Sequence, residues 1–564
     1  MDREQALADL RARQDRVRPA DTPRTVQHPL GERTVPGYVD AWAERAPQRT
    51  AVVRVDASGA EQSLTYADLA QAHARWAGWL RSAGVAPGDR VGLHLGNAAE
   101  FVVGMLGTLR DGAVHVPVNP MFQHAELVHE LRDSGASVVL TLAPLAERLC
   151  AAAAEAGTRT VVVLGGQKGA LPQVDGVAVH TWEEAMAAEP LATDEGDLDR
   201  LAALNYTGGT TGVPKGCEHT QGHMVYTAVS AAGANGFAPE EIVSLCFVPV
   251  FWIAGEDLGI LIPLVMGGTS VLMDRWDPAL VVDLVERHRV TSTAATVENF
   301  LAILDLPGIE GRDLSSLTSP LTMSFIQKLT PEIRRRWSEV VGPGSVLREG
   351  AYGMTETHTV DVVPFGFAED DHDLRTQPVF CGVPVPGTDV LVVDPETGEP
   401  LPVGERGEII MRSPSIMTGY WRNPEATAAQ LRDGWLHTGD SGYLDEDGCL
   451  HFLARSKEMI KVKGMSVFPA EVEMLLAQHP EVGSVAVVAA EDAETGQRPV
   501  AFVTPAEGAS PDAAALAAWA AETMAGYKVP LVQVLEDFPL TDTGKIRKVE
   551  LVDRAQALAD AARG

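Results

Sequence analysis

A loop of eleven residues, YTGGTTGVPKG at positions 206–216, has residue types that could bind phosphate. It contains four glycines, three threonines and one lysine, and it follows a short apolar run. Glycine lets backbone N–H groups come close to a ligand, while hydroxyls and a lysine ammonium suit phosphate oxygens. Glycine-rich loops are also common as plain surface connections, so this loop alone leaves both interpretations open.

Four further stretches carry side chains that would complete a nucleotide site. They are AYGMTET at 351–357, GWLHTGD at 434–440, RSKEMIKVKGMSVFPAEVE at 455–473 and PLTDTGKIRK at 539–548. Each has a plainer explanation: Tyr352 could be a core residue, Asp440 a turn residue and Lys545 a charge near the chain end. The basic stretch could be one solvated face made by Lys457, Lys461 and Lys463. Only their order and spacing together indicate a shared site.

Helices and strands alternate along much of the chain and must position these stretches. One apolar set recurs at helical spacing until Gly84 ends the run, namely Leu69, Ala72, Trp76 and Leu80. Residues 124–142 repeat the scheme with a helix, a glycine and a strand, and buried strands are predicted at 89–95 and 159–165. This alternation with nearly continuous apolar strands predicts an α/β fold of parallel-rich sheets covered by helices.

The pattern changes near residue 380. Strands joined by tight turns at 388–413 predict a small β-barrel-like part of the large unit. A helix at 468–480 and a strand at 484–490 then predict a small α+β unit at the C-terminus. We therefore expect a loosely held N-terminal arm at 1–30, a large unit at 31–455 and a C-terminal unit at 456–564.

Size and composition narrow the class of protein. The chain has 564 residues, and its net charge of -32 argues against a nucleic-acid partner. The five cysteines are scattered without a CxxC pair, so neither a disulfide framework nor a zinc site is expected. Residues 1–19 lack an apolar core and Pro263 breaks the apolar stretch 258–273, so we expect no signal peptide and no membrane span. We expect a cytoplasmic protein, with a homodimer as one option for its assembly.

Taken together and in this order, the five stretches resemble the adenylate-forming superfamily. That superfamily includes acyl- and aryl-CoA synthetases such as 4-coumarate–CoA ligase, luciferases and the adenylation domains of peptide synthetases. The resemblance extends over about residues 35–550. It implies an enzyme that uses ATP and Mg²⁺ to convert a carboxylic acid into an acyl-AMP and then transfers the acyl group to CoA. It also implies a mobile C-terminal unit with a hinge at Lys457.

The resemblance further implies a role for each motif residue. The β- and γ-phosphates of ATP would lie against Thr207, Gly208, Gly209, Thr210, Thr211, Gly212 and Lys215. Tyr352 would stack on adenine, and Asp440 with Arg455 would bind the ribose. Mg²⁺ would be held by Glu356 and Thr211, and the CoA channel would be lined by Lys461, Lys463 and Gly464. The catalytic residues would be Lys545, Lys215, Thr355 and Glu356.

The chemistry explains why such residues are needed. Attack of a carboxylate on the α-phosphate brings two anions together, so Mg²⁺, Lys545 and loop amides must neutralise the growing charge on phosphate and pyrophosphate. A second nucleophile must later reach the same carbonyl, and one fixed geometry fits both steps poorly. A rotating C-terminal unit would present Lys545 in the first step and the 461–464 region in the second.

The chain departs from the family pattern in the loop and in the acid pocket. Gly208 stands where serine is usual, which removes one hydroxyl from the phosphate loop. Trp252 stands where related CoA ligases have histidine and amino-acid-activating relatives have aspartate, which argues against an α-amino acid and favours an aryl or bulky acyl group. The other predicted pocket residues are Glu256, Glu298 and Gly350. A buried pair of Glu256 and Glu298 would favour a substrate with an amine or hydroxyl; alternatively, Glu256 caps or solvates a helix and Glu298 points outward.

The sequence therefore predicts an ATP-dependent ligase that joins an aryl or medium-to-long acyl acid to CoA. Two alternatives keep the adenylation step and change the acceptor: a carrier-protein thiol, or an aryl amine that reacts with adenylated nitrite, as in an ATP-dependent diazotase. A third reading is a non-catalytic nucleotide- or acyl-binding relative. The retention of Lys545, Glu356 and Asp440 argues against it.

Overall fold

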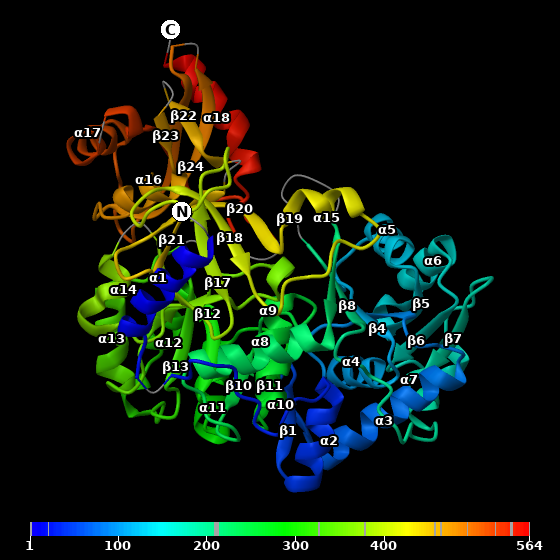
Figure 1. The fold of residues 1–564 in the computed structure, drawn as a ribbon. Coiled ribbons are helices and arrows are strands. Elements are labelled where there is room, and N and C mark those ends of the chain that lie inside the picture. The colour runs from blue at the N-terminus through cyan, green and yellow to red at the C-terminus, as the bar shows by residue number, and fades with distance from the viewer. Residues whose placement is uncertain are drawn as a thin grey trace.

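Two seven-stranded sheets form most of the large unit (Figure 1). The first has the strand order β7-β6-β5-β3-β4-β8-β9 and the second β14-β13-β12-β10-β11-β1-β2. Neighbouring strands are parallel except at one edge of each sheet, where β9 and β2 run antiparallel to their neighbours. The predicted α/β class with parallel-rich sheets is confirmed.

The computed structural model describes residues 3–20, 22–207, 214–324, 327–376, 379–455, 458–462, 465–492, 494–524, 526–541 and 545–562. The strands of the first sheet are β3 (Arg90–His94), β4 (Val114–Pro117), β5 (Ala136–Leu142), β6 (Thr160–Leu164), β7 (Ala178–Thr181), β8 (Leu201–Tyr206) and β9 (Gly216–Thr220). Those of the second are β1 (Thr50–Val55), β2 (Glu61–Thr65), β10 (Val243–Cys246), β11 (Thr269–Met273), β12 (Ser292–Thr296), β13 (Ser319–Met323) and β14 (Arg348–Glu349).

Helices pack on these sheets where the periodic apolar residues predict them. The helix α3 (Tyr66–Ser82) begins at a capping box of Thr65 and Asp68 and buries Leu69, Trp76 and Leu80. The helix α5 (His124–Ser134) ends at Gly135, whose φ of 64° is a left-handed conformation that favours glycine. The other helices are α2 (Val35–Arg45), α4 (Ala99–Arg110), α6 (Ala146–Ala156), α7 (Trp182–Met186), α8 (Gln221–Ala234), α9 (Ile253–Glu256), α10 (Ile262–Val265), α11 (Pro278–His288), α12 (Val297–Leu304), α13 (Pro331–Val341), α14 (His372–Arg375) and α15 (Pro424–Gln430).

A third, antiparallel sheet with the order β15-β16-β21-β20-β18-β17 is the predicted β-barrel-like part. Its strands are β15 (Val362–Val363), β16 (Val379–Pro384), β17 (Asp389–Val393), β18 (Gly407–Arg412), β19 (Leu431–Arg432), β20 (Trp435–Leu444) and β21 (Leu450–Arg455). The long hairpin of β20 and β21 carries two residues of the predicted ribose site, Asp440 and Arg455, as cross-strand neighbours.

The N-terminal segment differs from the loosely held arm that the sequence predicts. Residues 3–17 form helix α1 (Arg3–Val17), which lies beside the third sheet (Figure 1). Leu7 and Leu10 are buried against that sheet, and the Arg11 guanidinium forms a bidentate pair with Asp389. Two leucines three residues apart give this otherwise polar helix one apolar face, and burial of that face holds it in place.

The C-terminal unit has its own sheet and its own core. The sheet has the order β23-β22-β25-β24, with β26 beside β25, and the unit forms the orange and red part of Figure 1. Its elements are β22 (Ile460–Val462), β23 (Met465–Val467), α16 (Pro469–Leu476), β24 (Val482–Asp492), β25 (Gly496–Pro505), α17 (Ala513–Thr523), β26 (Leu531–Val534) and α18 (Val549–Ala561). Phe468 packs with Leu453 and Ala454 of the large unit. The boundary at 455–456 stays a prediction, because residues 456–457 lie outside the described ranges.

Two further properties concern the whole fold. All five cysteines are buried and free. Across the ranges that the structure describes, every helix is too short or too polar to cross a membrane.

Candidate functional site

The predicted phosphate loop connects β8 to β9, the antiparallel edge of the first sheet. Tyr206 pairs with Gly216 at the end of this hairpin, and the Thr207 N–H donates to the Lys215 carbonyl at 3.0 Å. These contacts hold both ends of the loop at the sheet edge. The predicted phosphate-binding residues between them, Gly208, Gly209, Thr210, Thr211 and Gly212, lie outside the described residues.

Lys215 and Glu356 meet through a tyrosine that the motifs did not include. The Lys215 ammonium lies 4.3 Å from the centre of the Tyr420 ring, and the Tyr420 hydroxyl donates to Glu356 Oε1 at 2.6 Å. Burial and the Glu356 charge raise the pKa of Tyr420, so this phenol remains a proton donor at neutral pH. Tyr420 therefore orients the carboxylate with its hydroxyl and attracts the lysine cation with its ring face.

Thr355 and Glu356 lie in a single 3₁₀ turn, Thr355–Thr357. The Thr355 carbonyl is 2.7 Å from Nε2 of His219, a buried residue of β9. Gly353 is needed just before this turn, because a Cβ there would lie 1.3 Å from the Thr359 carbonyl oxygen. The turn is thus tied to the strand that follows the phosphate loop, which brings two of the predicted motifs together.

Asp440 is the centre of the predicted ribose site, and only 3% of its surface is exposed. The Tyr352 hydroxyl donates to Asp440 Oδ2 at 2.8 Å, and Arg455 Nε lies 3.6 Å from Oδ1. Burial raises the pKa of Asp440, while Tyr352 and Arg455 act in the opposite direction. Oδ1 accepts no hydrogen bond from the described part of the chain, so an acceptor is available that fits a ribose hydroxyl.

Lys545 belongs to the C-terminal unit and lies next to β-bridged residues of the described chain. The Thr541 N–H donates to the Lys545 carbonyl at 2.7 Å, and Leu540 and Ile546 form a β-bridge. Lys545 is exposed, but partial desolvation by the surrounding chain and, to a smaller degree, the positive charge of Arg455 lower the pKa of its ammonium. The lysine from the far end of the chain therefore lies within electrostatic range of the Asp440–Arg455 pair.

Only Lys461 of the predicted hinge and CoA residues lies within the described part of the chain. Lys457, Lys463 and Gly464 lie outside the described residues. Lys461 lies on β22, where its backbone N–H donates to Gln497 Oε1 at 2.8 Å and its side chain is exposed.

Each of the predicted acid-pocket residues makes its own contacts in the large unit, and their shared pocket stays a prediction. Trp252 is the N-cap of α9, half-buried, with its ring edge-on to Phe251. Glu298 Oε1 accepts from the Gln327 N–H at 2.9 Å. The Gly350 N–H donates to the Thr322 carbonyl at 2.9 Å.

Glu256 has no exposed surface and is paired inside the large unit. Its Oε2 lies 3.2 Å from Nε2 of His115 and accepts from Asn205 at 3.3 Å. Although burial opposes ionisation, His115 keeps the pKa of Glu256 below its usual value. Glu256 and Glu298 thus have separate partners, and Glu256 neither caps a helix nor contacts solvent.

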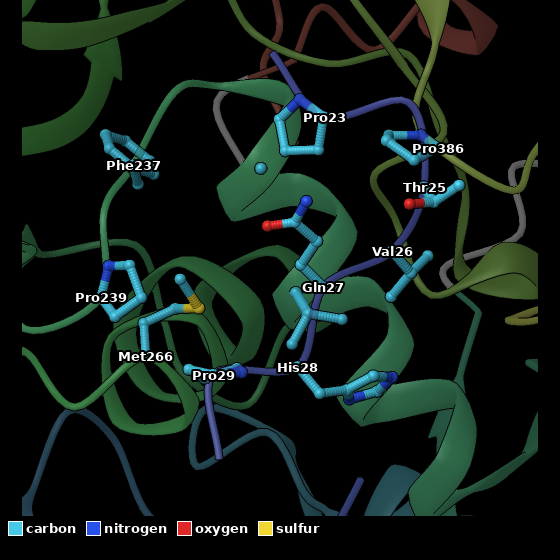
Figure 2. Close-up of a pocket in the computed structure, with 12 residues that line it drawn as sticks. Pro23, Thr25, Val26, Gln27, His28, Pro29, Phe237, Pro239, Met266 and Pro386 are labelled. Atoms are coloured by element: carbon cyan, nitrogen blue, oxygen red, sulfur yellow. The ribbon is translucent and has the colours of Figure 1, made fainter. Parts of the chain in front are cut away.

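A hollow elsewhere on the molecule is unrelated to these residues. Figure 2 shows it between the segment 23–29 and the helix α8, with Phe237 and Met266 on its wall. None of the predicted site residues lines it. Its wall is mainly apolar and proline-rich, which does not suit a triphosphate.

Three residues near the motifs were missed by reasoning from the sequence: Tyr420, His219 and His358. Tyr420 is 64 residues from the Glu356 carboxylate to which it donates, and no local pattern links the two. The histidines offered a signal, because His219 and His223 follow the phosphate loop four residues apart and His358 follows Glu356 by two.

Known protein families and individual relatives match most of this chain. Residues 39–421 match the AMP-binding enzyme family and residues 471–545 match the AMP-binding enzyme C-terminal domain. The chain is 34% identical over 502 residues to 4-coumarate–CoA ligase 3 of Oryza sativa subsp. japonica, covering 88% of either chain. It is 36% identical over 490 residues to a feruloyl-CoA synthase of Amycolatopsis sp., covering 87% of this chain and 93% of the relative. The amide bond synthetase McbA of Marinactinospora thermotolerans superposes with a TM-score of 0.79 at 28% identity, over 93% of this chain and 100% of McbA.

Proposed function

Because the chain belongs to the AMP-binding enzyme family and is an adenylate-forming ligase of the acid–thiol type, we propose that it converts an aryl or medium-to-long acyl acid into its acyl-AMP and then into a CoA thioester. The observation that carries this proposal is the site around buried Asp440, which accepts from the Tyr352 hydroxyl, lies near Arg455 and keeps one oxygen without a hydrogen bond in the described part of the chain. The charge of Arg455 also lowers the pKa of Lys545, which supports a role for this lysine near the residues proposed to bind the ribose.

In the first step, a carboxylate oxygen attacks the α-phosphate of ATP and the bond to pyrophosphate breaks. Asp440 Oδ1 would accept a ribose hydroxyl, while Tyr352 holds the carboxylate in place and offers its ring to adenine. Lys215 and Lys545 would stabilise the charge that develops on the transferred phosphate and on pyrophosphate. The loop 207–215 would supply backbone N–H groups to the same anion.

Glu356 is the carboxylate proposed to hold Mg²⁺, together with Thr211. Within the described ranges, no three His, Cys, Asp or Glu side chains are arranged to hold a metal. One carboxylate fits Mg²⁺ nonetheless, because this ion is usually held by one or two carboxylates, substrate phosphates and water. When bound, Mg²⁺ would neutralise phosphate charge. Tyr420 would keep Glu356 oriented toward it.

The proposed class of acid substrate follows from Trp252, which would form part of the wall of the acid pocket. An exposed part of this indole gives the start of α9 an aromatic surface suited to a planar or bulky acyl group. The two sequence relatives are named for 4-coumarate and feruloyl groups, which are aromatic. An aryl acid is therefore the first choice.

CoA is the proposed acceptor because the two sequence relatives reported above are named as CoA ligases and the segment KVKGMSVFPAEVE is retained. An amine is the second candidate, favoured by the likeness to an amide bond synthetase over nearly the whole chain. The carrier thiol and the nitrite route have no such support.

The test is pyrophosphate release from MgATP with a panel of aryl and acyl acids, with nitrite as one member. Release with an aryl or acyl acid supports the adenylation step, and release with none would refute it. CoA, and in parallel a panel of amines, is then added and the product is weighed by mass spectrometry. A product whose mass is unaffected by CoA but increases with an amine would replace the thiol acceptor with the amine.

A further inference from the structure

The helical segment that starts the predicted acid pocket carries two consecutive buried acids. Glu256 ends α9, and Asp257 begins a π-helical segment (Asp257–Leu261). Both are fully buried. Glu256 points to His115 and Asn205 of the first sheet, as described above, whereas Asp257 points to His358. π-helical segments are rare and frequently mark functional sites, so the wide turn at Asp257 needs a reason.

Asp257 and His358 form an ion pair inside the molecule. Their Oδ1 and Nδ1 atoms are 3.0 Å apart, and both side chains are 0% exposed. His358 immediately follows the Thr355–Thr357 turn, while Asp257 lies on the helical segment that Trp252 caps. The pair therefore joins the turn with the proposed nucleotide contacts to the segment with the proposed acid contacts.

The backbone at His358 requires such a support. His358 has φ 56° and Thr359 has φ 82°, two consecutive left-handed residues without glycine. A β-branched residue in this region is an outlier, and such conformations persist where the surrounding structure enforces them. The ion pair to Asp257 is one contact that fixes the strained segment directly behind Glu356.

The same turn is also held from two other directions. The His219 ring lies edge-on to the His358 ring, with centres 4.8 Å apart, and its Nε2 faces the Thr355 carbonyl. On the other side, the Thr357 hydroxyl donates to buried Asp361. Since these side chains surround the turn without being assigned to the nucleotide itself, their common effect is to fix where Thr355 and Glu356 point.

We propose that Asp257 and His358 are positioning residues for adenylation, which lock the Thr355–Thr357 turn to the helical segment of the acid pocket. The pair makes no contact with substrate and acts through Thr355 and Glu356. Loss of the pair would let the turn relax, so that Glu356 no longer meets the magnesium nucleotide in the right geometry. This inference rests on the proposed function for its catalytic meaning, but its structural part concerns MgATP binding alone.

The test uses three variants of the full-length protein: Asp257→Asn, His358→Asn and the double variant. Asparagine tolerates the left-handed conformation of residue 358, so the substitution removes the ion pair without adding a backbone clash. His73→Asn is the matched control, because His73 is also fully buried and lies 3.2 Å from an aspartate, Asp40, far from the site. Melting temperature gives the effect on folding for all four.

Two readouts separate positioning from folding. MgATP affinity is measured by calorimetry without acid, and pyrophosphate exchange is measured with the best acid of the panel, both per folded molecule. We expect each single variant to lose roughly tenfold in MgATP affinity and roughly 10–100-fold in exchange kcat. The double variant should lose no more than the single variant with the larger loss, because both substitutions break the same contact. His73→Asn should lower the melting temperature while MgATP affinity and exchange stay at the wild-type level.

Three results would overturn the inference. These are wild-type MgATP affinity in both single variants, multiplicative losses in the double variant, or an equal loss in His73→Asn. A wild-type protein that binds MgATP but activates no acid would refute the proposed function, while the affinity comparison would still decide the positioning role. A wild-type protein that binds no MgATP would overturn both.

Discussion

Replacing Tyr420 by phenylalanine tests the arrangement around Glu356. The substitution removes the hydroxyl that donates to Glu356 at 2.6 Å and lies 2.9 Å from the Gln430 side-chain amide. It keeps the ring on which the Lys215 ammonium lies at 4.3 Å. The variant therefore removes the support of the proposed magnesium ligand and leaves the cation–π contact of the phosphate-loop lysine intact.

The size of the effect follows from the kind of hydrogen bond that is lost. A hydrogen bond to a charged partner contributes about 1.5–3 kcal/mol, and Glu356 is only half-buried, so water replaces part of it. We take the lower end, about 1.5 kcal/mol, which corresponds to a roughly tenfold change in an equilibrium constant. Because the carboxylate must then be ordered when MgATP binds, the loss should appear as a roughly tenfold higher KM for MgATP.

The assay is pyrophosphate exchange as a function of MgATP concentration at saturating acid. Tyr38→Phe serves as the control, since the Tyr38 hydroxyl is also buried and donates to the Gly31 carbonyl at 2.8 Å, away from the motifs. It should change stability but not KM. If Tyr420→Phe leaves the KM for MgATP unchanged, or if Tyr38→Phe raises it equally, the role given to Tyr420 is wrong.

Three further predictions follow from other parts of the molecule. Lys545→Ala should reduce adenylation by orders of magnitude and barely change thioester formation from supplied acyl-AMP, measured as separate half-reactions. Equal losses in both would contradict a C-terminal unit that rotates between the two steps. Trp252→Ala should move the acid preference toward bulkier acids in the pyrophosphate panel, whereas an unchanged preference would remove Trp252 from the pocket. Glu130 is buried on α5, and burial followed by the charges of Asp133 and Glu126 raises its pKa to about 8 from a usual value of 4.5. Between these two pKa values the folded state holds a proton that the unfolded state releases, so the free energy of unfolding falls as pH rises from about 5 to 8. In urea unfolding, Glu130→Gln should match the wild type at pH 5 and have a free energy of unfolding higher by on the order of 3 kcal/mol at pH 8.

The sequence predicts those features that neighbouring residues determine. The helix α3 follows from apolar spacing and the capping box at Thr65, and the end of α5 follows from Gly135. The sheets follow from the alternation of apolar strands and helices, and the nucleotide motifs could be placed because each is a continuous stretch. The helix α1 could have been found from Leu7 and Leu10, but its charged residues concealed the apolar face.

Contacts between distant segments could not be predicted in the same way. The helical turn from Trp252 to Glu256 is present, since the Glu256 N–H donates to the Trp252 carbonyl at 2.9 Å. The direction of the Glu256 side chain is set by His115, which lies on β4 of the first sheet. No sequence pattern near Glu256 predicts this contact. The Tyr420–Glu356 hydrogen bond depends likewise on how the segment after β18, which bridges to Cys217 of β9, lies beside the Thr355–Thr357 turn.

Under the proposed function, the position of Lys545 would link movement of the C-terminal unit to nucleotide binding. Partial desolvation and the like charge of Arg455 lower the pKa of Lys545, so bringing this lysine to the site is electrostatically unfavourable by itself. An anion bound between Lys545 and Arg455 would offset this unfavourable interaction. A triphosphate would therefore favour the arrangement with Lys545 near Arg455. By linkage the effect is reciprocal, so release of pyrophosphate would weaken the same arrangement and free the unit to turn for the second step. In a chain with a net charge of -32 the general field repels anions, so this coupling must come from the few cations at the site.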